Sequence, residues 1–203
     1  MGYKGFLLAG LLLGASLWAG AGEQVFVVGA HGPKHVNVTI ESDTDLEAIV
    51  TTSNTATGQV AWDREAKTGS VKLSVPVNSL HTGIEKRDEH LQGEGWLDAA
   101  KNPEISFAST LVKHVKDDEY EITGTFTLKG VEKEVKANAT VKYIAYKPEF
   151  EKMGLPKGNL ARFSVAFDLK LSDFGIKSPA IPAKVSDTLK VKLALMGVEE
   201  IKE

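Results

Sequence analysis

The chain has 203 residues, of which 42% are hydrophobic, a size that supports one full hydrophobic core and favours a single domain over two. Its 24 basic and 27 acidic residues give a formal net charge of −3, so the chain offers no broad positive field and nucleic-acid binding is not expected. Because the chain contains no cysteine, disulfides, thiol catalysis and cysteine-type zinc sites are excluded.

The first 21 residues have the features of a secretory signal peptide. Lys4 supplies the positive charge, Phe6 to Trp18 form an apolar run, and residues 19–21 (Ala-Gly-Ala) are small enough for cleavage. The alternative is a permanent anchor, but the run falls short of the roughly 20 residues that a membrane-spanning helix needs. We therefore expect export, cleavage after residue 21, no membrane span in the mature chain, and one domain over residues 22–203.

Alternation of apolar and polar residues with a period of two predicts β-strands after residue 30. The alternation is clearest at 163–171, 120–128 and 189–195, and a turn around Gly130 links the second of these to a strand at 132–143. Pro76 indicates a strand edge or end, because proline cannot donate to a β-ladder. The other expected strands are 71–77 and, with weaker patterns, 36–40, 47–52, 59–62 and 105–111. Eight or nine strands with little helix favour a closed antiparallel barrel or a sandwich.

A short helical segment is expected around residues 83–92. Thr82 and Glu85 occupy the positions of a capping box, and Ile84, Asp88 and Leu91 fall on one helical face. Glycines at 93 and 95 limit this helix to a few turns. Residues 147–159 and 177–183 are rich in glycine or proline and are expected to be loops.

The sequence holds little positive evidence for catalysis or metal binding. Gly32 and Pro33 lie between His31 and His35 and argue against the helix that would bring these histidines onto one metal. Asp88 and His90 are two residues apart and would point to different helix faces, so a structural network that includes Arg87 is favoured over acid–base catalysis. His81 and His114 have no identifiable partner. The sequence has no Gly-x-Ser-x-Gly elbow, phosphate-cradling glycine-rich loop or His-Glu-x-x-His helix, and we expect no catalytic residue, metal or cofactor.

Periodicity alone leaves open whether the barrel is filled or hollow. An eight-stranded barrel has a lumen that is either packed with side chains or holds one small ligand. Phe126, Phe163 and Phe167 fit an ordinary packed core equally well.

The central part of the sequence contains four segments in a distinctive order and spacing: residues 79–83 (Ser-Leu-His-Thr-Gly), 87–91 (Arg-Asp-Glu-His-Leu), 96–98 (Trp-Leu-Asp) and 102–109 (Asn-Pro-Glu-Ile-Ser-Phe-Ala-Ser). Together they resemble the signature tract of the YceI-like family of polyisoprenoid-binding proteins. Residues 122–135 and 173–176 agree as well, so that the resemblance covers roughly residues 69 to 196. Residues 30–65 match poorly.

The resemblance implies an all-β, eight-stranded, lipocalin-like barrel in the periplasm, often a homodimer, that binds a long-chain isoprenoid or similar amphiphilic lipid without catalysis. The residues expected to contact the lipid are Leu73, Val75, Leu91, Trp96, Ile105, Phe107, Ile122, Phe126, Leu128, Phe163, Val165, Phe167, Leu169 and Phe174. In particular, Phe126, Phe163, Phe167 and Leu169 are expected to border an elongated apolar tunnel. Gln92 and Leu171 stand where the family often has arginine, so a neutral quinone or amide-type head group is favoured over a pyrophosphate.

Two rival functions have structural discriminators. A periplasmic enzyme acting on a lipid or quinone-like substrate would need Asp88 and His90 within hydrogen-bond reach of a pocket atom. A structural or stress-protective protein would have a filled core with no channel long enough for a lipid tail.

Overall fold

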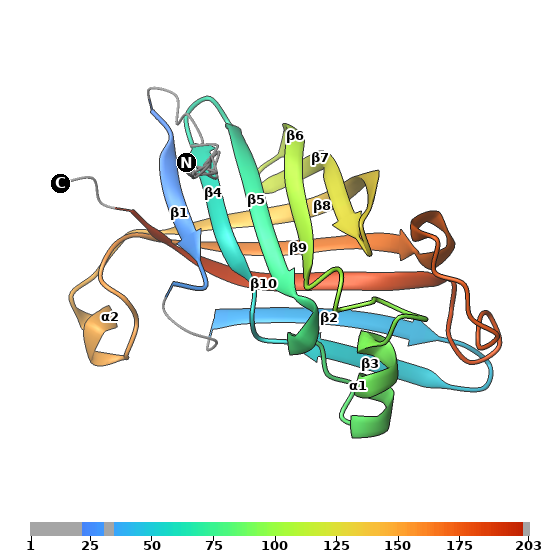
Figure 1. Ribbon diagram of the computed structural model, residues 1–203. Coiled ribbons are helices and arrows are strands. Elements are labelled where there is room, and N and C mark those ends of the chain that lie inside the picture. Colours follow the sequence, from blue (N-terminus) through green and yellow to red (C-terminus); the bar gives the residue numbers. More distant parts are fainter. Residues whose placement is uncertain (1–21, 31–34, 201–203) are drawn as a thin grey trace, which may run out of the picture.

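In the computed structural model, which describes residues 22–30 and 35–200, the chain folds into one antiparallel sheet of ten strands (Figure 1). The strands are β1 (Gln24–Val28), β2 (Val36–Asp43), β3 (Ala48–Ser53), β4 (Thr57–Asp63), β5 (Thr68–Pro76), β6 (Glu104–Lys116), β7 (Glu119–Leu128), β8 (Val131–Ile144), β9 (Leu160–Lys170) and β10 (Thr188–Glu199). The predicted signal peptide and His31 lie outside the described residues.

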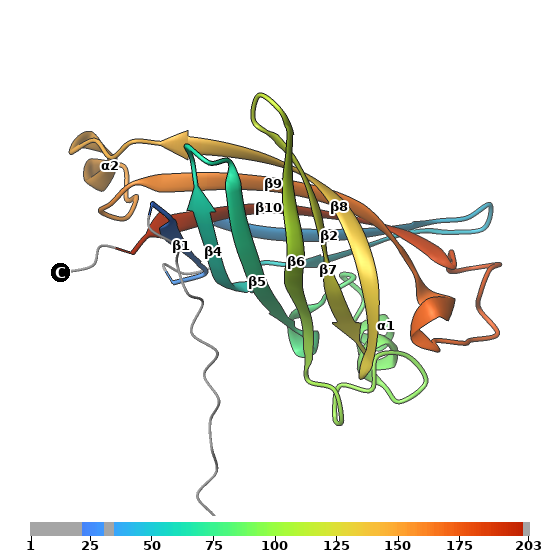
Figure 2. The same ribbon diagram turned by 90° about the horizontal axis from the view of Figure 1, so that it is seen from above.

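Eight of these strands close into a barrel, which confirms the expected fold class. The order is β1-β4-β5-β6-β7-β8-β9-β10, and β1 pairs with β10 at the seam, where Val28 lies opposite Gly197. The first residues of β10 pair instead with β2, so the β2–β3 hairpin continues the sheet past the seam. Figure 2 shows the long strands β8, β9 and β10 arching over one side of the barrel.

Four short helices complete the fold within the described residues. They are α1 (Glu85–Gln92), α2 (Glu149–Lys152) and two 3-10 turns, Val77–Ser79 and Leu171–Phe174. The α1 helix lies beside the β2–β3 hairpin (Figure 1), and an ion pair between Arg87 and Glu47 joins the two. A backbone bridge between Thr52 and His81 also links β3 to the segment that precedes α1.

The expected capping box of α1 does not form. The N-cap residue is Ile84, and no side chain caps the helix. Thr82 instead donates its hydroxyl to Asp88 Oδ1 at 2.6 Å and its backbone N–H to the same oxygen at 2.7 Å. The helix is therefore held at its start by a carboxylate from its own first turn.

Other differences from the expected elements are small. The structure adds β1, which was not predicted, and places α2 inside the expected loop at 147–159. Leu171 belongs to a 3-10 turn because β9 ends one residue earlier, at Lys170. Pro76 ends β5, as expected for a residue without an N–H donor. Within the described residues, no helix has the length and hydropathy needed to cross a membrane.

Candidate ligand cavity

One half of the barrel encloses an apolar cavity of about 470 Å³. Its walls are the inward side chains of β5 to β10 together with β2 and β3, α1, and the segment 178–185. This volume lies within the range of about 300–1,000 Å³ that small-molecule sites occupy. The cavity shows that the barrel is not filled throughout. This argues against the rival hypothesis of a structural or stress-protective protein, which required a filled core.

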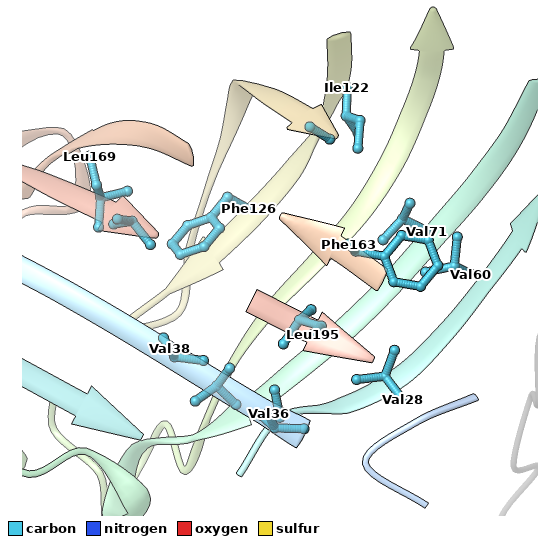
Figure 3. Packing of buried hydrophobic residues seen from close by; sticks show 14 of the residues in the cluster. Val28, Val36, Val38, Val60, Val71, Ile122, Phe126, Phe163, Leu169 and Leu195 are labelled. Carbon is cyan, nitrogen blue, oxygen red and sulfur yellow. The ribbon is translucent and has the colours of Figure 1, made fainter. Parts of the chain in front are cut away.

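The other half of the barrel is filled. Phe26, Leu160 and Leu195 are each no more than 2% exposed there, close to the seam between β1 and β10. Figure 3 shows Phe163 with Val60 and Val71 in this half, and Phe126 with Leu169 set apart toward the other. Val165 and Phe167 face the interior as well, but unlike the residues of the filled half they are only half-buried. This exposure arises because they border the cavity.

Most of the residues predicted to contact lipid line this cavity. They are Leu73, Val75, Leu91, Trp96, Ile105, Phe107, Phe126, Leu128, Val165, Phe167 and Leu169. Whether they touch a lipid stays a prediction, but their side chains are in position to do so.

Three of the predicted contact residues do not line it. Ile122 and Phe163 border a separate inner cavity of about 40 Å³ in the filled half. Phe174 is 2% exposed and packs behind Phe126, with ring centroids 5.7 Å apart. The expected tunnel border is therefore wrong for Phe163, because alternation places its side chain inside the barrel but not at the depth of the cavity.

The structure adds lining residues that the sequence did not identify. They include Val38, Ile40, Ile49, Leu80, Leu97, Val135, Ala137, Leu171, Val185, Leu189, Val191 and Leu193. The alternation of the strands at 132–143 and 189–195 was a sufficient signal for Val135, Leu189, Val191 and Leu193. Val185 lies in a loop without periodicity and had no such signal.

A glycine makes room for one wall of the cavity. A Cβ atom at Gly124 would lie 2.5 Å from Cζ of Phe107 and 2.4 Å from the carbonyl oxygen of Ala108. The Phe107 ring on β6 therefore lies over the bare backbone of β7, where any larger residue would collide with it. Phe107 in turn lines the cavity.

Polar side chains that line the cavity mark its mouth. Glu47, Arg87, His90 and Lys184 come from the β2–β3 hairpin, α1 and the segment 178–185, and His90 and Lys184 are exposed. The ion pair between Arg87 and Glu47 neutralises the charge of this arginine. The mouth thus joins an apolar interior to a polar, solvated rim.

The candidate acid–base pair of α1 is not assembled. His90 lines the cavity, whereas Asp88 does not. Asp88 instead bonds to Thr82 and lies 3.4 Å from Nδ1 of His81. Burial acts most strongly on this carboxyl and opposes its ionisation, but the hydrogen bonds from Thr82 and His81 together hold the pKa of Asp88 below its ordinary value. These contacts hold Asp88 at the start of α1 and away from the cavity lining.

Among the described residues, the other histidines do not form a metal site. His114 and His81, for which no partner was expected, both have one: Nε2 of His114 lies 2.9 Å from the carbonyl oxygen of Asp117, and His81 lies beside Asp88. In residues 22–30 and 35–200, no group of three or more histidine, aspartate and glutamate side chains is arranged to hold a metal ion.

The fold and its interior define a lipocalin-like β-barrel with an apolar ligand cavity at one end. A model of the YceI-like domain matches residues 31–196 of the sequence. The chain therefore belongs to the YceI-like family. UPF0312 proteins of Pseudomonas putida (strain W619) and Pectobacterium atrosepticum are 34% and 35% identical to it over 145 residues, 70% of each chain.

Solved structures share the fold at low sequence identity. The crystal structure of Burkholderia cenocepacia BcnA superposes with a TM-score of 0.69 and 21% identity, covering 81% of this chain and 97% of that one. A polyisoprenoid binding domain from Saccharophagus degradans gives a TM-score of 0.59 and 15% identity, covering 86% of this chain and 98% of its own.

Proposed function

We propose that this protein is a non-catalytic carrier that binds a long-chain isoprenoid or similar amphiphilic lipid inside the barrel. The observation that carries the proposal is the cavity of about 470 Å³, with apolar walls and a polar mouth. Membership of the YceI-like family supports it, as does the structural likeness to a domain described as polyisoprenoid-binding. Asp88 is tied to Thr82 and His81 rather than placed in the cavity, which weighs against the alternative of an enzyme.

The driving force for binding is the transfer of the lipid chain out of water. Each buried methylene group contributes about 0.8 kcal/mol, so a chain of about 20 carbons gives about 16 kcal/mol before opposing terms. The ordering of the chain and the loss of translational freedom offset much of this favourable free energy. We therefore expect a dissociation constant in the micromolar range or tighter.

The rim of the cavity favours a neutral head group such as a quinone or an amide. Arg87 already has its charge neutralised by Glu47, and Leu171 places an apolar side chain in the wall where the family often has arginine. A pyrophosphate would need several charge-assisted hydrogen bonds to replace its hydration. Lys184, among the described residues that line the cavity, is an exposed cation at the mouth.

The place of action proposed for the carrier is the periplasm. Residues 1–21 would direct export and be removed, leaving a mature chain that begins at Gly22. Mass spectrometry of protein purified from the periplasm measures the mature mass directly. An uncleaved chain retained with the inner membrane would contradict this part of the proposal, and the mass of the intact assembly shows whether it is a homodimer.

Native mass spectrometry of the protein purified from its own host tests the central claim. We expect a lipid adduct that survives gentle ionisation and, after extraction, proves to carry a long isoprenoid or acyl chain. Protein that comes through mild purification without any adduct, and that fails to take up an added isoprenoid, would overturn the carrier function.

A further inference from the structure

The cavity ends inside the barrel at a floor formed by two side chains. Leu73 and Val165 line both the large cavity and the inner cavity of about 40 Å³. No other residue in the described part of the chain lines both. The two side chains therefore lie at the boundary between the hollow half of the barrel and the filled half.

The two residues come from opposite walls of the barrel. Leu73 lies on β5 and Val165 on β9, which are four strands apart in the closed order of eight. In a closed eight-stranded barrel, strands four apart face each other across the axis. Both residues are half-buried, as expected for side chains whose upper surface borders the cavity.

Beyond the floor, an aromatic plug leaves no route for a longer chain. Phe26 packs against Trp62 and Phe163 with ring centroids 6.2 and 6.3 Å apart. Trp62 also donates its indole N–H to the hydroxyl of Tyr120 at 3.1 Å, and both side chains are buried. A lipid tail could enter this region only by breaking that hydrogen bond and displacing closely packed rings.

The volume above the floor sets a chain length. A dry protein cavity of about 150 Å³ binds benzene, which corresponds to about 25 Å³ for each carbon atom. At that density the cavity of about 470 Å³ holds about 19 carbons, close to four isoprene units.

We propose that Leu73 and Val165 act as a chain-length stop that limits the buried tail to about 20 carbons, so that any further isoprene units extend out of the mouth. This inference rests on the proposed lipid-carrier function and adds a substrate class to it: isoprenoids of about four units, or longer ones held with their far end outside.

Substitutions at the floor should move the limit in both directions. Replacing both residues by alanine removes about five carbon atoms and joins the inner cavity, which adds about 165 Å³, enough for one further isoprene unit. Val165→Phe adds about four carbons to the floor and should shorten the limit by about one unit. Leu73→Phe, on the opposite wall, adds about three carbons and should also shorten the limit, to about three units. Val71→Ala serves as the matched control, because Val71 borders only the inner cavity.

The test titrates the mature protein with prenyl alcohols that lengthen by one isoprene unit at a time, from two units to seven. In the unmodified protein, affinity should rise at least about tenfold with each unit up to four and change less than about twofold beyond. The plateau should begin at five units in the double alanine variant, at three in either phenylalanine variant, and at four in Val71→Ala. Circular dichroism establishes that each variant is folded.

The outcomes separate the length stop from the carrier function itself. If the unmodified protein binds no member of the series, the carrier function fails. If it binds them with affinity that keeps rising to seven units, the carrier function stands and the length stop is wrong. A plateau at four units that stays in place in the folded floor variants would assign the limit to other residues and overturn the role of Leu73 and Val165.

Discussion

The ring of Phe167 on β9 meets the ring of Phe126 on β7 nearly edge to face, with centroids 5.7 Å apart and planes at 65°. Both rings line the cavity, so this pair forms part of its wall. The neighbouring Asp168 is exposed on the outer face of the same strand. Substitution of Phe167 therefore tests whether the ligand lies in the lumen, and substitution of Asp168 on the same strand is the control.

Phe167→Asp should lower lipid affinity steeply, whereas Asp168→Asn should leave it nearly unchanged. An aspartate at position 167 places a carboxyl in an apolar cavity, where desolvation opposes its charge by several kcal/mol unless it stays protonated or draws in water. Asp168→Asn alters a solvated charge, and such surface changes stay within about 0.5 kcal/mol. The measurement is titration with a fluorescent isoprenoid, with circular dichroism on both variants. Equal binding by the two folded proteins would mean that the ligand lies outside the lumen.

Asp88→Ala and His90→Ala should differ in their effects on stability. Asp88 accepts two hydrogen bonds from Thr82 that hold the start of α1, so its removal should lower the free energy of unfolding by about 1–3 kcal/mol. His90 is exposed at the mouth, and its replacement should change stability by no more than about 0.5 kcal/mol. Urea unfolding followed by circular dichroism measures both. We expect the double variant to be destabilised without loss of any chemical turnover; a lipid-dependent reaction that disappears at unchanged stability would favour an enzyme.

Acid should weaken the hydrogen bonds that Thr82 donates to Asp88. The pKa of Asp88 is lower in the folded protein than in the unfolded chain, so the folded state binds fewer protons around that pH. The stabilisation is fully present above the unfolded pKa, near 4, and is lost as the pH falls through the lower, folded value. Unfolding free energy measured between pH 6 and pH 2 should therefore decline more steeply in the unmodified protein than in Asp88→Asn. Parallel pH profiles would show that this carboxylate makes no contribution to acid stability.

Gly124→Ala should destabilise the barrel even in the absence of ligand. The new methyl group would collide with the ring of Phe107 and with the carbonyl oxygen of Ala108, a backbone atom that cannot move freely. Overpacking of this kind destabilises by about 1–3 kcal/mol. Gly95→Ala is a matched control, because a Cβ at Gly95 has nothing within 4 Å. Thermal unfolding of the two variants gives the comparison. Equal melting temperatures would show that the Phe107 ring can move aside without loss of stability.

The sequence predicted the long strands well because one face of each is apolar and the other polar. The alternation at 163–171 and 120–128 corresponds to β9 and β7. It failed for β1, whose residues 25–28 (Val-Phe-Val-Val) are apolar without interruption. In the barrel Phe26 and Val28 are buried, whereas Val25 and Val27 on the other face are only half-buried. Because that outer face also carries valines, the sequence shows no alternation there.

Depth along the barrel axis could not be predicted from alternation. Phe163 and Phe167 have the same inward phase on one strand, yet the first joins the aromatic plug and the second lines the cavity. The floor likewise depends on which strands face each other, a property of the closed sheet order rather than of any single segment. Leu91 and Trp96 were identified through the family resemblance, because their segment has no strand periodicity.

Glu47→Gln should change which head groups the protein accepts. The substitution keeps the size of the side chain but leaves Arg87 unpaired at the mouth of the cavity. An unpaired guanidinium can make charge-assisted hydrogen bonds to a phosphate, which are roughly twice as strong as neutral ones. Affinity for a four-unit prenyl phosphate should therefore rise about tenfold, while affinity for the matching alcohol stays within about twofold.

Asp45→Asn controls for the general loss of one negative charge. Asp45 lies on the same hairpin turn and is exposed, but Arg87 is paired with Glu47 rather than with Asp45. It should therefore raise phosphate affinity much less than Glu47→Gln does. The gain in Glu47→Gln should also shrink when the salt concentration rises from 0.05 M to 0.5 M, because screening weakens a partly exposed ion pair. If phosphate affinity is the same in Glu47→Gln as in the unmodified protein, the head group does not lie near Arg87, and the ligand enters the barrel in another orientation.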